Sequence, residues 1–358
     1  MNSRLSNIEL LRIICMFFVV LLHFNNHGAN KDLIFFTGDL TLQNTLGHLI
    51  ESFAIIAVNC FVLISGYFGI SFKIRNILKL YLQCFFIGVI GYLLYVIFTD
   101  NLFDIAKLCT RVFAFTRNKY WFLYAYLFLI FISPLLNFAI DKMTKMQYRR
   151  VVLLLSIFML YFSYMRNVGD NTIGMSYVQF IYLYLIARYL GLYVSLETIK
   201  RNRYKYLIGY IIMSLCTFLL ALVEQSFHLQ LLFLRPYPYN SFFIVLGAIF
   251  FLLFMLSIDI QSNVINWFSS SIFAVYLLQE NPYFGFKVLY PWVETIFMNI
   301  GDNLVLRYCL LFAGSLFFVI ITVGIDKLCG VLSKPILMSY DKYVAPKLLA
   351  LQSKIDDK

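Results

Sequence analysis

Arg12 and His23 are the residues of this sequence whose types and spacing most clearly allow chemistry. Both lie in one apolar stretch, residues 8–24, with ten residues between them. Eleven helical steps turn through about 1,100°, so both side chains point in nearly the same direction, roughly 16 Å apart along the axis. Ionisable residues inside a membrane helix are costly and therefore functional candidates. Arginine suits the binding of phosphate, and histidine can transfer a proton near neutral pH.

Glu9 is expected to serve Arg12 rather than His23. It lies three residues before Arg12, a spacing at which side chains on a helix can pair. About 21 Å of helix separates it from His23. We therefore expect another helix to supply the partner of His23.

The elements that position this pair are expected to be membrane helices. Of the 358 residues, 61% are hydrophobic and 13% are charged, against about 25% charged in a typical soluble domain. Apolar runs predict about ten spanning helices, at residues 8–25, 46–70, 77–98, 120–140, 151–166, 176–196, 206–223, 241–258, 264–282 and 304–325. We therefore predict an all-α, polytopic membrane protein, with its membrane domain in residues 1–326 and a basic tail at 327–358.

The distribution of lysine and arginine predicts the orientation. With the N-terminus in the cytoplasm, 18 of the 29 Lys and Arg residues lie on the inner side and eight on the outer side. Positive residues favour the cytoplasmic side, and an even number of helices returns the C-terminus there, so both termini are predicted to be cytoplasmic. The basic loops also account for the net charge of +11, and nucleic acid is not expected as a partner.

Among the outer segments, residues 103–115 are predicted to form a short helix lying in the membrane interface. Apolar side chains such as Phe103 and Phe113 alternate there with charged ones such as Lys107 and Arg111. This mixture is typical of a helix that rests on the boundary between lipid and water.

The predicted topology sorts the candidate site residues into two layers. Residues suited to catalysis or substrate binding fall in the outer layer: His23, Glu51, Glu280, Trp121 and Gln279. Cations suited to binding an anionic ligand fall in or near the inner half: Arg12, Arg75, Lys79 and Arg188. Glu9, the expected partner of Arg12, lies with them. Simpler roles stay open, because Arg75 and Lys79 also fit positive-inside anchors and His23 fits an interfacial histidine. The other histidines lack metal-like spacing to acidic residues, so no metal site is expected.

Four segments, in order along the chain, are similar to the membrane-bound acyltransferase type 3 family. The first is the helix from Arg12 to His23, since an arginine and a histidine separated by ten residues are that family's signature. The other three are residues 60–67 (CFVLISGY), 120–123 (YWFL) and 271–278 (SIFAVYLL). Together they extend the resemblance over nearly the whole chain.

Two features depart from the pattern of that family. Residues 73–81 lack the Arg-x-x-Arg motif followed by proline that often opens the third helix, which leaves the roles of Arg75 and Lys79 open. Gln279 stands where the ninth helix frequently carries a histidine.

The resemblance implies a ten-helix core that transfers an acyl group, usually acetyl, from coenzyme A to a carbohydrate hydroxyl. His23 would be the catalytic histidine, either as a base or as an acyl acceptor, and Arg12 would contribute to donor binding. Acetyl-CoA would be a donor substrate rather than a permanently bound cofactor. The acceptor would be a capsule, an exopolysaccharide or a lipid-linked glycan, met at a bacterial plasma membrane.

A second hypothesis is a flippase or polymerase of glycan export. Such proteins also have ten or more helices and intramembrane arginines. They typically carry larger outer loops or internal symmetry, neither of which is evident in this sequence. Consumption of a thioester distinguishes the two hypotheses.

Overall fold

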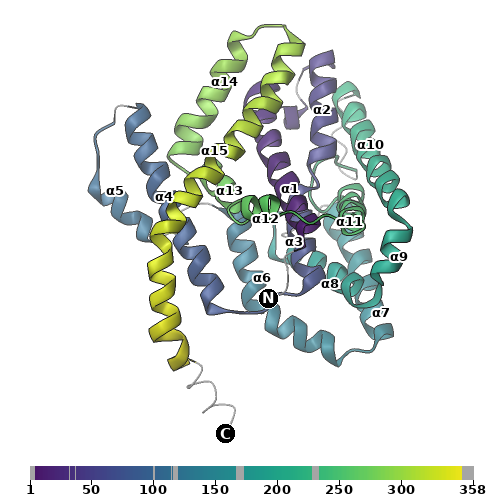
Figure 1. Cartoon of the computed structure of the whole chain (residues 1–358). Helices are drawn as coiled ribbons and strands as arrows, with labels where there is room; N and C mark the ends of the chain where they lie inside the picture. Colours follow the sequence, from purple (N-terminus) through teal and green to yellow (C-terminus); the bar gives the residue numbers. More distant parts are fainter. Residues whose placement is uncertain are drawn as a thin grey trace.

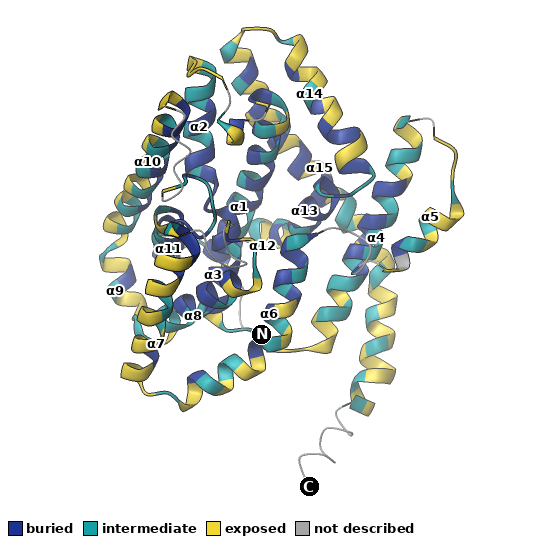
Figure 2. Ribbon diagram, turned by 180° about the vertical axis from the view of Figure 1, so that it is seen from behind, coloured by how far each residue is buried: buried dark blue, intermediate teal, exposed yellow. Residues whose placement is uncertain are grey.

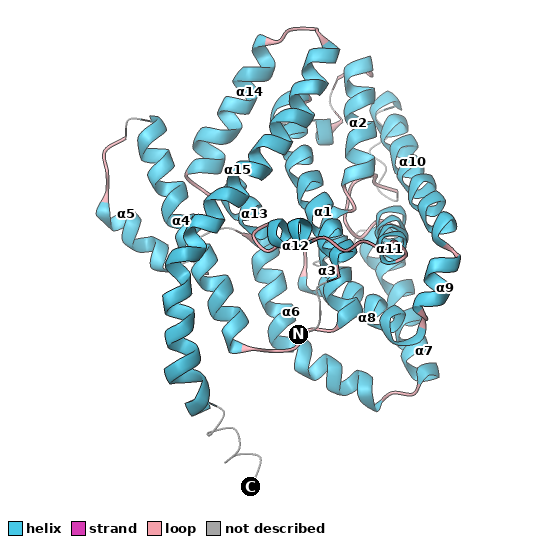
Figure 3. Cartoon of the chain, viewed as in Figure 1, coloured by secondary structure: helices cyan, strands magenta, loops and turns pink. Residues whose placement is uncertain are grey.

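The computed structural model describes residues 5–348, except 32, 37, 100, 114, 116–119, 167–172 and 228–233. Within these residues every regular element is a helix, as predicted (Figure 3). The α-helices are α1 (Ser6–Phe24), α2 (Leu42–Ala54), α3 (Ala57–Phe68), α4 (Ile74–Thr99), α5 (Ile105–Cys109), α6 (Trp121–Lys142), α7 (Lys145–Phe158), α8 (Tyr177–Tyr193), α9 (Leu196–Arg201), α10 (Arg203–Phe227), α11 (Phe242–Leu256), α12 (Asn263–Ser269), α13 (Phe273–Gln279), α14 (Tyr290–Asn299) and α15 (Leu304–Ser339). Short 3-10 or π segments occupy Asn25–Ala29, Leu33–Phe35, Thr110–Phe113, Met159–Met165, Gly285–Leu289 and Tyr340–Val344.

Helix α1 lies at the centre of the bundle and carries both residues of the predicted pair. It packs against α2, α3, α11, α12, α13 and α15 (Figure 1). Its apolar residues Leu11, Cys15 and Val20 have no exposed surface. Since α1 is unbroken from Ser6 to Phe24, Arg12 and His23 keep their predicted separation along one helix.

Seven helical segments among the described residues are long and apolar enough to cross a membrane. They coincide with seven of the ten predicted spans and comprise Ser6–Ala29, Leu42–Phe68, Ile74–Thr99, Trp121–Lys142, Lys145–Met165, Arg203–Phe227 and Leu304–Leu348. Two further predicted spans form the shorter helices α8, of 17 residues, and α11, of 15. The number of ten spanning helices therefore stays a prediction.

The remaining predicted span, residues 264–282, was wrong as a single helix. A turn at residues 270–272 separates α12 from α13, and it begins within three consecutive serines, of which Ser269 ends α12 and Ser270 and Ser271 lie in the turn. Serine side chains compete with the helical hydrogen-bond ladder, and the Ser270 hydroxyl here donates to the carbonyl of Trp267 over 2.8 Å. Apolar composition hides this break, and the two short helices differ in burial: α13 is largely buried, whereas Val264 and Trp267 of α12 are exposed.

The exposed outward faces of the helices, yellow in Figure 2, carry many large apolar side chains. Leu219 in α10 is 59% exposed and Phe317 in α15 is 65% exposed, as expected of helix faces that contact lipid. Within residues 103–115 the structure has the short helix α5 and the 3-10 turn after it; the location of this segment in the membrane interface stays a prediction.

The last helix, α15, runs past residue 326, so the beginning of the predicted tail continues it. Arg75 at the start of α4 pairs with Asp341 beyond the end of α15 at 2.8 Å. The last part of the predicted tail, residues 349–358, lies outside the described residues.

Candidate active site

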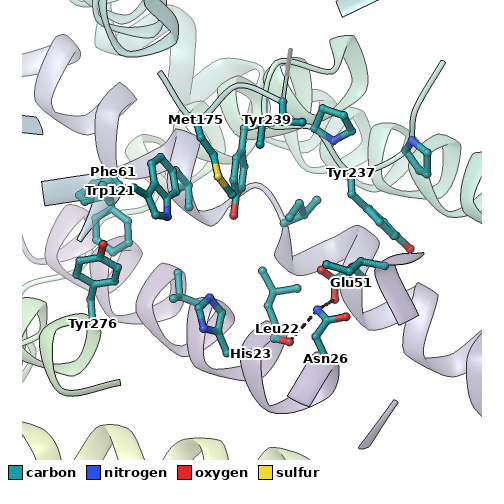
Figure 4. A pocket seen from close by; sticks show the side chains of 18 of the residues that line it. Leu22, His23, Asn26, Glu51, Phe61, Trp121, Met175, Tyr237, Tyr239 and Tyr276 are labelled. Carbon is teal, nitrogen blue, oxygen red and sulfur yellow. Dashed lines mark hydrogen bonds between the residues drawn. The ribbon is translucent and has the colours of Figure 1, made fainter. Parts of the chain in front are cut away.

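A cavity of about 630 Å³ opens beside α1 and brings together His23, Glu51 and Trp121 (Figure 4). These residues come from α1, α2 and α6, which are far apart in the sequence. Most of the wall is apolar or aromatic. The lining residues are Met16, Val19, Leu22, His23, Asn26, His27, Ile34, Phe36, Glu51, Ile55, Val58, Phe61, Trp121, Phe122, Ile173, Met175, Glu224, Arg235, Pro236, Tyr237, Pro238, Tyr239, Phe273 and Tyr276.

Two partners hold the imidazole of His23. Its Nδ1 lies 2.9 Å from Oε1 of Glu280 and 2.6 Å from the hydroxyl oxygen of Tyr290. The Tyr290 hydroxyl donates to the same carboxylate oxygen over 2.6 Å. A carboxylate can only accept, so this network assigns the imidazole hydrogen to Nδ1 and leaves the lone pair on Nε2. The ring, which lines the cavity, thus has a basic nitrogen available for a ligand.

A tight turn brings Glu280 and Tyr290 together. Glu280 directly follows α13, and Tyr290 is the first residue of α14. Between them, Oδ1 of Asn281 accepts the backbone N–H groups of Tyr283, at 3.0 Å, and Phe284, at 3.1 Å. A Cβ at Gly285 would collide with the backbone carbonyl oxygen of Gln279. Only glycine fits this close approach, and the turn fixes the Glu280 carboxylate relative to Tyr290.

Burial keeps the Tyr290 hydroxyl protonated. Desolvation raises the pKa of Tyr290 well above its ordinary value, and the neighbouring charge of Glu280 raises it further. The ring stacks on His27 at a centroid distance of 4.0 Å, with the two planes inclined by 19°. Tyr290 therefore stays a hydrogen-bond donor to Glu280 over the whole physiological pH range.

Glu51 lines the cavity, as does one other carboxylate, Glu224. Glu51 is only 3% exposed and accepts hydrogen bonds from the side-chain amides of Asn25, at 3.3 Å, and Asn26, at 3.0 Å. Both asparagines follow α1 in the π turn Asn25–Ala29, and Asn26 also donates to the carbonyl of Leu22 (Figure 4). The turn after α1 thus ties the helix of His23 to the carboxylate on α2.

Aromatic side chains form the opposite wall. Trp121 stacks on Tyr239 at a centroid distance of 5.7 Å, and both line the cavity with Tyr237 and Tyr276 (Figure 4). The backbone carbonyl of Tyr239 accepts from Asn59 over 2.8 Å, which secures this loop against α3. Such flat apolar faces, set beside polar tips, can stack against sugar rings.

Arg12 lies at the far end of α1, outside the cavity lining. As predicted, it pairs with Glu9, at 2.6 Å, and the hydroxyl of Ser269 donates to the other oxygen of Glu9 over 2.5 Å. The Arg12 side chain remains 35% exposed, which leaves part of its guanidinium accessible. Met16, one turn farther along α1, does line the cavity, so the cavity ends about one turn from Arg12.

The other three predicted cations do not line the cavity either. Arg75 is exposed and paired with Asp341, and Lys79 is exposed one turn farther along α4. Arg188 on α8 is partly buried, with its guanidinium carbon 3.1 Å from where a Cβ at Gly69 would lie. The structure thus separates the predicted anion-binding residues from the predicted catalytic ones.

Gln279 has no exposed surface and does not line the cavity. Its side-chain oxygen and nitrogen have no hydrogen-bond partner among the described residues. The structure therefore does not bring Gln279 to a substrate in this cavity, although its backbone helps to form the turn that carries Glu280.

Sequence reasoning missed Tyr290, Asn25 and Asn26. Tyr290 lies in a segment rich in aromatic residues, so its sequence context does not distinguish it from the tyrosines around it. The two asparagines directly follow the histidine helix, and consecutive amides at a membrane helix end are a usable signal for a buried polar partner.

A family model described as an acyltransferase domain matches residues 5–324, which include the cavity, Glu280 and Tyr290. The chain belongs to the acyltransferase type 3 family. Comparisons of the acyltransferase with curated proteins and with solved structures give no match. The family and the apolar helices together make it a membrane acyltransferase.

Proposed function

We propose that this acyltransferase moves an acetyl group from cytoplasmic acetyl-CoA to a hydroxyl of a cell-surface polysaccharide or its lipid-linked precursor, in a bacterial plasma membrane. The observation that carries the proposal is the arrangement of His23, whose Nδ1 is held by Glu280 and Tyr290. A histidine oriented by a carboxylate is the arrangement that activates hydroxyl nucleophiles in many acyl-transfer enzymes.

In the proposed reaction, Nε2 of His23 removes the proton of the acceptor hydroxyl. The hydroxyl oxygen attacks the thioester carbonyl carbon, a carbon–oxygen bond forms, and the carbon–sulfur bond breaks. The imidazolium then returns its proton to the departing thiolate, which leaves as the free thiol of coenzyme A. Glu280 supports this cycle by stabilising the imidazolium, and Tyr290 holds the carboxylate in place.

The donor is proposed to approach along α1 from the end that carries Arg12. Guanidinium groups bind phosphate bidentately and remain charged in a low-dielectric site, as the phosphates of acetyl-CoA require. The cavity reaches from His23 to Met16, one turn from Arg12, which supports a thioester arm lying along this helix. Arg188, half-buried on α8, is the second candidate for a phosphate contact, ahead of Arg75, which already pairs with Asp341.

The acceptor sugar is proposed to lie between His23 and the aromatic wall. Trp121 and Tyr239 offer a stacked apolar surface, and Glu51 offers a buried carboxylate that can accept from a sugar hydroxyl. Carbohydrates combine apolar faces with hydroxyl rims, so this combination of wall and carboxylate favours a sugar over a purely apolar acceptor.

The test compares His23→Ala and Glu280→Gln with the wild-type protein. The alanine variant should release no coenzyme A above background, and the glutamine variant should lose about 10²–10⁴-fold in kcat. Coenzyme A release by purified protein and acetylation of surface glycans in cells are the two measurements.

Glu294→Gln is the matched control, because Glu294 is a half-buried carboxylate that pairs with Lys31 at 2.6 Å and does not line the cavity. Its kcat should equal that of the wild type. Normal coenzyme A release by folded His23→Ala protein would rule out the catalytic assignment. Glycan export without any thioester consumption would instead support a flippase.

A further inference from the structure

A second pocket, of about 460 Å³, lies between α5 and the segment that follows Glu280. Lys107 and Arg111 line it from α5 and the turn after it, and Tyr283 and Lys287 line it from the opposite side. It shares no lining residue with the cavity at His23. Figure 1 shows α5 beside α4, at the edge of the bundle.

The pocket concentrates positive charge. Three cationic side chains line it, and no acidic residue does among the described residues. Arg111 is only 4% exposed, and its guanidinium lies 5.0 Å from the centroid of the Tyr283 ring. The ammonium of Lys287 lies 5.4 Å from the same centroid. Like charges held against one ring repel each other, and an anion between them would relieve that repulsion.

Hydrogen bonds fix the α5 side of the pocket. The backbone N–H of Asp104 donates to the Tyr92 hydroxyl over 2.8 Å, and that hydroxyl donates to the Asp104 carbonyl over 3.0 Å, which ties α5 to α4. The carboxylate of Asp104 caps α5 by accepting from the backbone N–H groups of Ala106 and Lys107. It also pairs with the Lys107 side chain at 3.4 Å, and Arg111 donates to the hydroxyl of Thr110 over 2.7 Å.

Exposed apolar side chains lie on α5 and the loop before it, just before the lining residues in the sequence. Leu102 is 93% exposed, Ile105 is 68% exposed and Phe103 is 53% exposed. Exposed apolar residues beside clustered cations are the features of a surface that meets both the acyl chains and the phosphates of lipids.

We propose that this pocket binds the phosphate or diphosphate headgroup of a membrane lipid. Arg111 supplies a planar fork for two phosphate oxygens, and Lys107 and Lys287 supply point charges from either side. The apolar residues beside the pocket receive the lipid tail, which distinguishes this ligand from a soluble phosphate. The site is independent of the reaction proposed at His23, and its test uses no acyl donor.

The pocket and the proposed reaction site share one chain segment. Tyr283 follows Glu280 by three residues, and Lys287 precedes Tyr290 by three. A headgroup bound here therefore lies against the outer side of the turn that holds the Glu280 carboxylate. A glycan carried on such a lipid would start beside the cavity.

The test measures lipid binding to the full-length protein in neutral detergent by native mass spectrometry. The probes are farnesyl diphosphate, dioctanoyl phosphatidylglycerol, dioctanoyl phosphatidylcholine and inorganic pyrophosphate. The double variant Lys107→Gln/Lys287→Gln should bind both anionic lipids at least about tenfold more weakly than the wild type, since two charge-assisted contacts are lost. Lys31→Gln/Lys142→Gln has the same net charge, and its binding should stay within about twofold of the wild type.

Each outcome bears on the proposal. Farnesyl diphosphate binding far better than phosphatidylglycerol identifies a diphosphate-linked carrier, and equal binding of the two identifies the headgroup of bulk phospholipid. The proposal is overturned if phosphatidylcholine binds as well as the anionic lipids, if both double variants weaken binding equally, or if only pyrophosphate binds. Arg111→Lys keeps the positive charge and removes the planar guanidinium. In folded protein, this variant should bind the anionic lipids more weakly than the wild type and more tightly than Lys107→Gln/Lys287→Gln.

Discussion

At the scale of single residues, the Tyr290 hydroxyl contacts both the His23 imidazole and the Glu280 carboxylate. Tyr290→Phe keeps the ring that stacks on His27 and removes the donor to Glu280. The direct pair between His23 and Glu280 remains, so we expect kcat to fall about 10–100-fold, the equivalent of one hydrogen bond to a charged group, with little change in donor KM. Steady-state coenzyme A release measures both constants.

Tyr148→Phe is the control for this change. Tyr148 is buried like Tyr290, and its hydroxyl donates to the carbonyl of Leu185 over 2.8 Å between α7 and α8. Its kcat should stay within about twofold of the wild type. Equal losses in both variants would show that the effect of Tyr290→Phe is one of packing, and the positioning role would be abandoned.

Arg12 provides a second prediction at this scale. Arg12→Gln removes the charge and fork proposed for the donor phosphates and keeps a polar side chain beside Glu9. We expect donor KM to rise at least about tenfold while kcat changes little, because the interaction is made equally in the ground and transition states. Arg150→Gln, an exposed cation on α7, serves as the comparison. An unchanged donor KM in Arg12→Gln would exclude Arg12 from donor binding.

Local spacing predicted part of this site, and long-range packing supplied the rest. The shared direction of Arg12 and His23, and the Arg12–Glu9 pair, follow from helical geometry alone. That His23 needs a partner from another helix also followed, because no acidic residue of α1 can reach it. Which helix provides that partner depends on how α13 and α14 fold back onto α1. No periodic pattern in the sequence encodes that packing.

At the scale of elements, the turn between α13 and α14 determines where Glu280 lies. Gly285→Ala would force a methyl group against the Gln279 carbonyl, so we expect a loss of stability of about 1–3 kcal/mol together with reduced activity. Gly314→Ala in α15 is the matched change, because a Cβ there meets nothing within 4 Å. It should be neutral, or stabilise the helix by up to about 1 kcal/mol. Thermal unfolding in detergent measures both; similar melting temperatures would contradict the constraint at Gly285.

Composition predicted most of the helices but not their interruptions. Apolar length alone identified Trp121–Lys142 and Arg203–Phe227 as spans. The same criterion joined α12 to α13, since the serines around residue 270 do not interrupt an apolar run. The interruption matters for function, because Ser269 at the turn reaches Glu9 while α13 carries Glu280 towards His23.

At the scale of the whole molecule, orientation is the main prediction left to test. Cys109 on α5 is exposed, and the predicted topology puts it on the outer side of the membrane. A membrane-impermeant maleimide should therefore label intact cells producing the wild-type protein, and the Cys109→Ser variant should lose that labelling. The Cys309→Ser variant should still be labelled, because Cys309 lies within the lipid-facing helix α15 and is not expected to react. Labelling that appears only after permeabilisation would reverse the orientation.

The length of α15 has a consequence for the membrane around the protein. Its 36 residues extend over about 54 Å, whereas the hydrocarbon layer of a typical bilayer is about 30 Å thick. Apolar residues such as Val331, which is 68% exposed, continue along the part that extends past the rest of the bundle. Longer lipid chains would cover more of this surface and shorter ones would expose it. Each ångström of hydrophobic mismatch costs less than about 1 kcal/mol. We therefore expect the stability of the enzyme to depend on the thickness of the membrane that holds it.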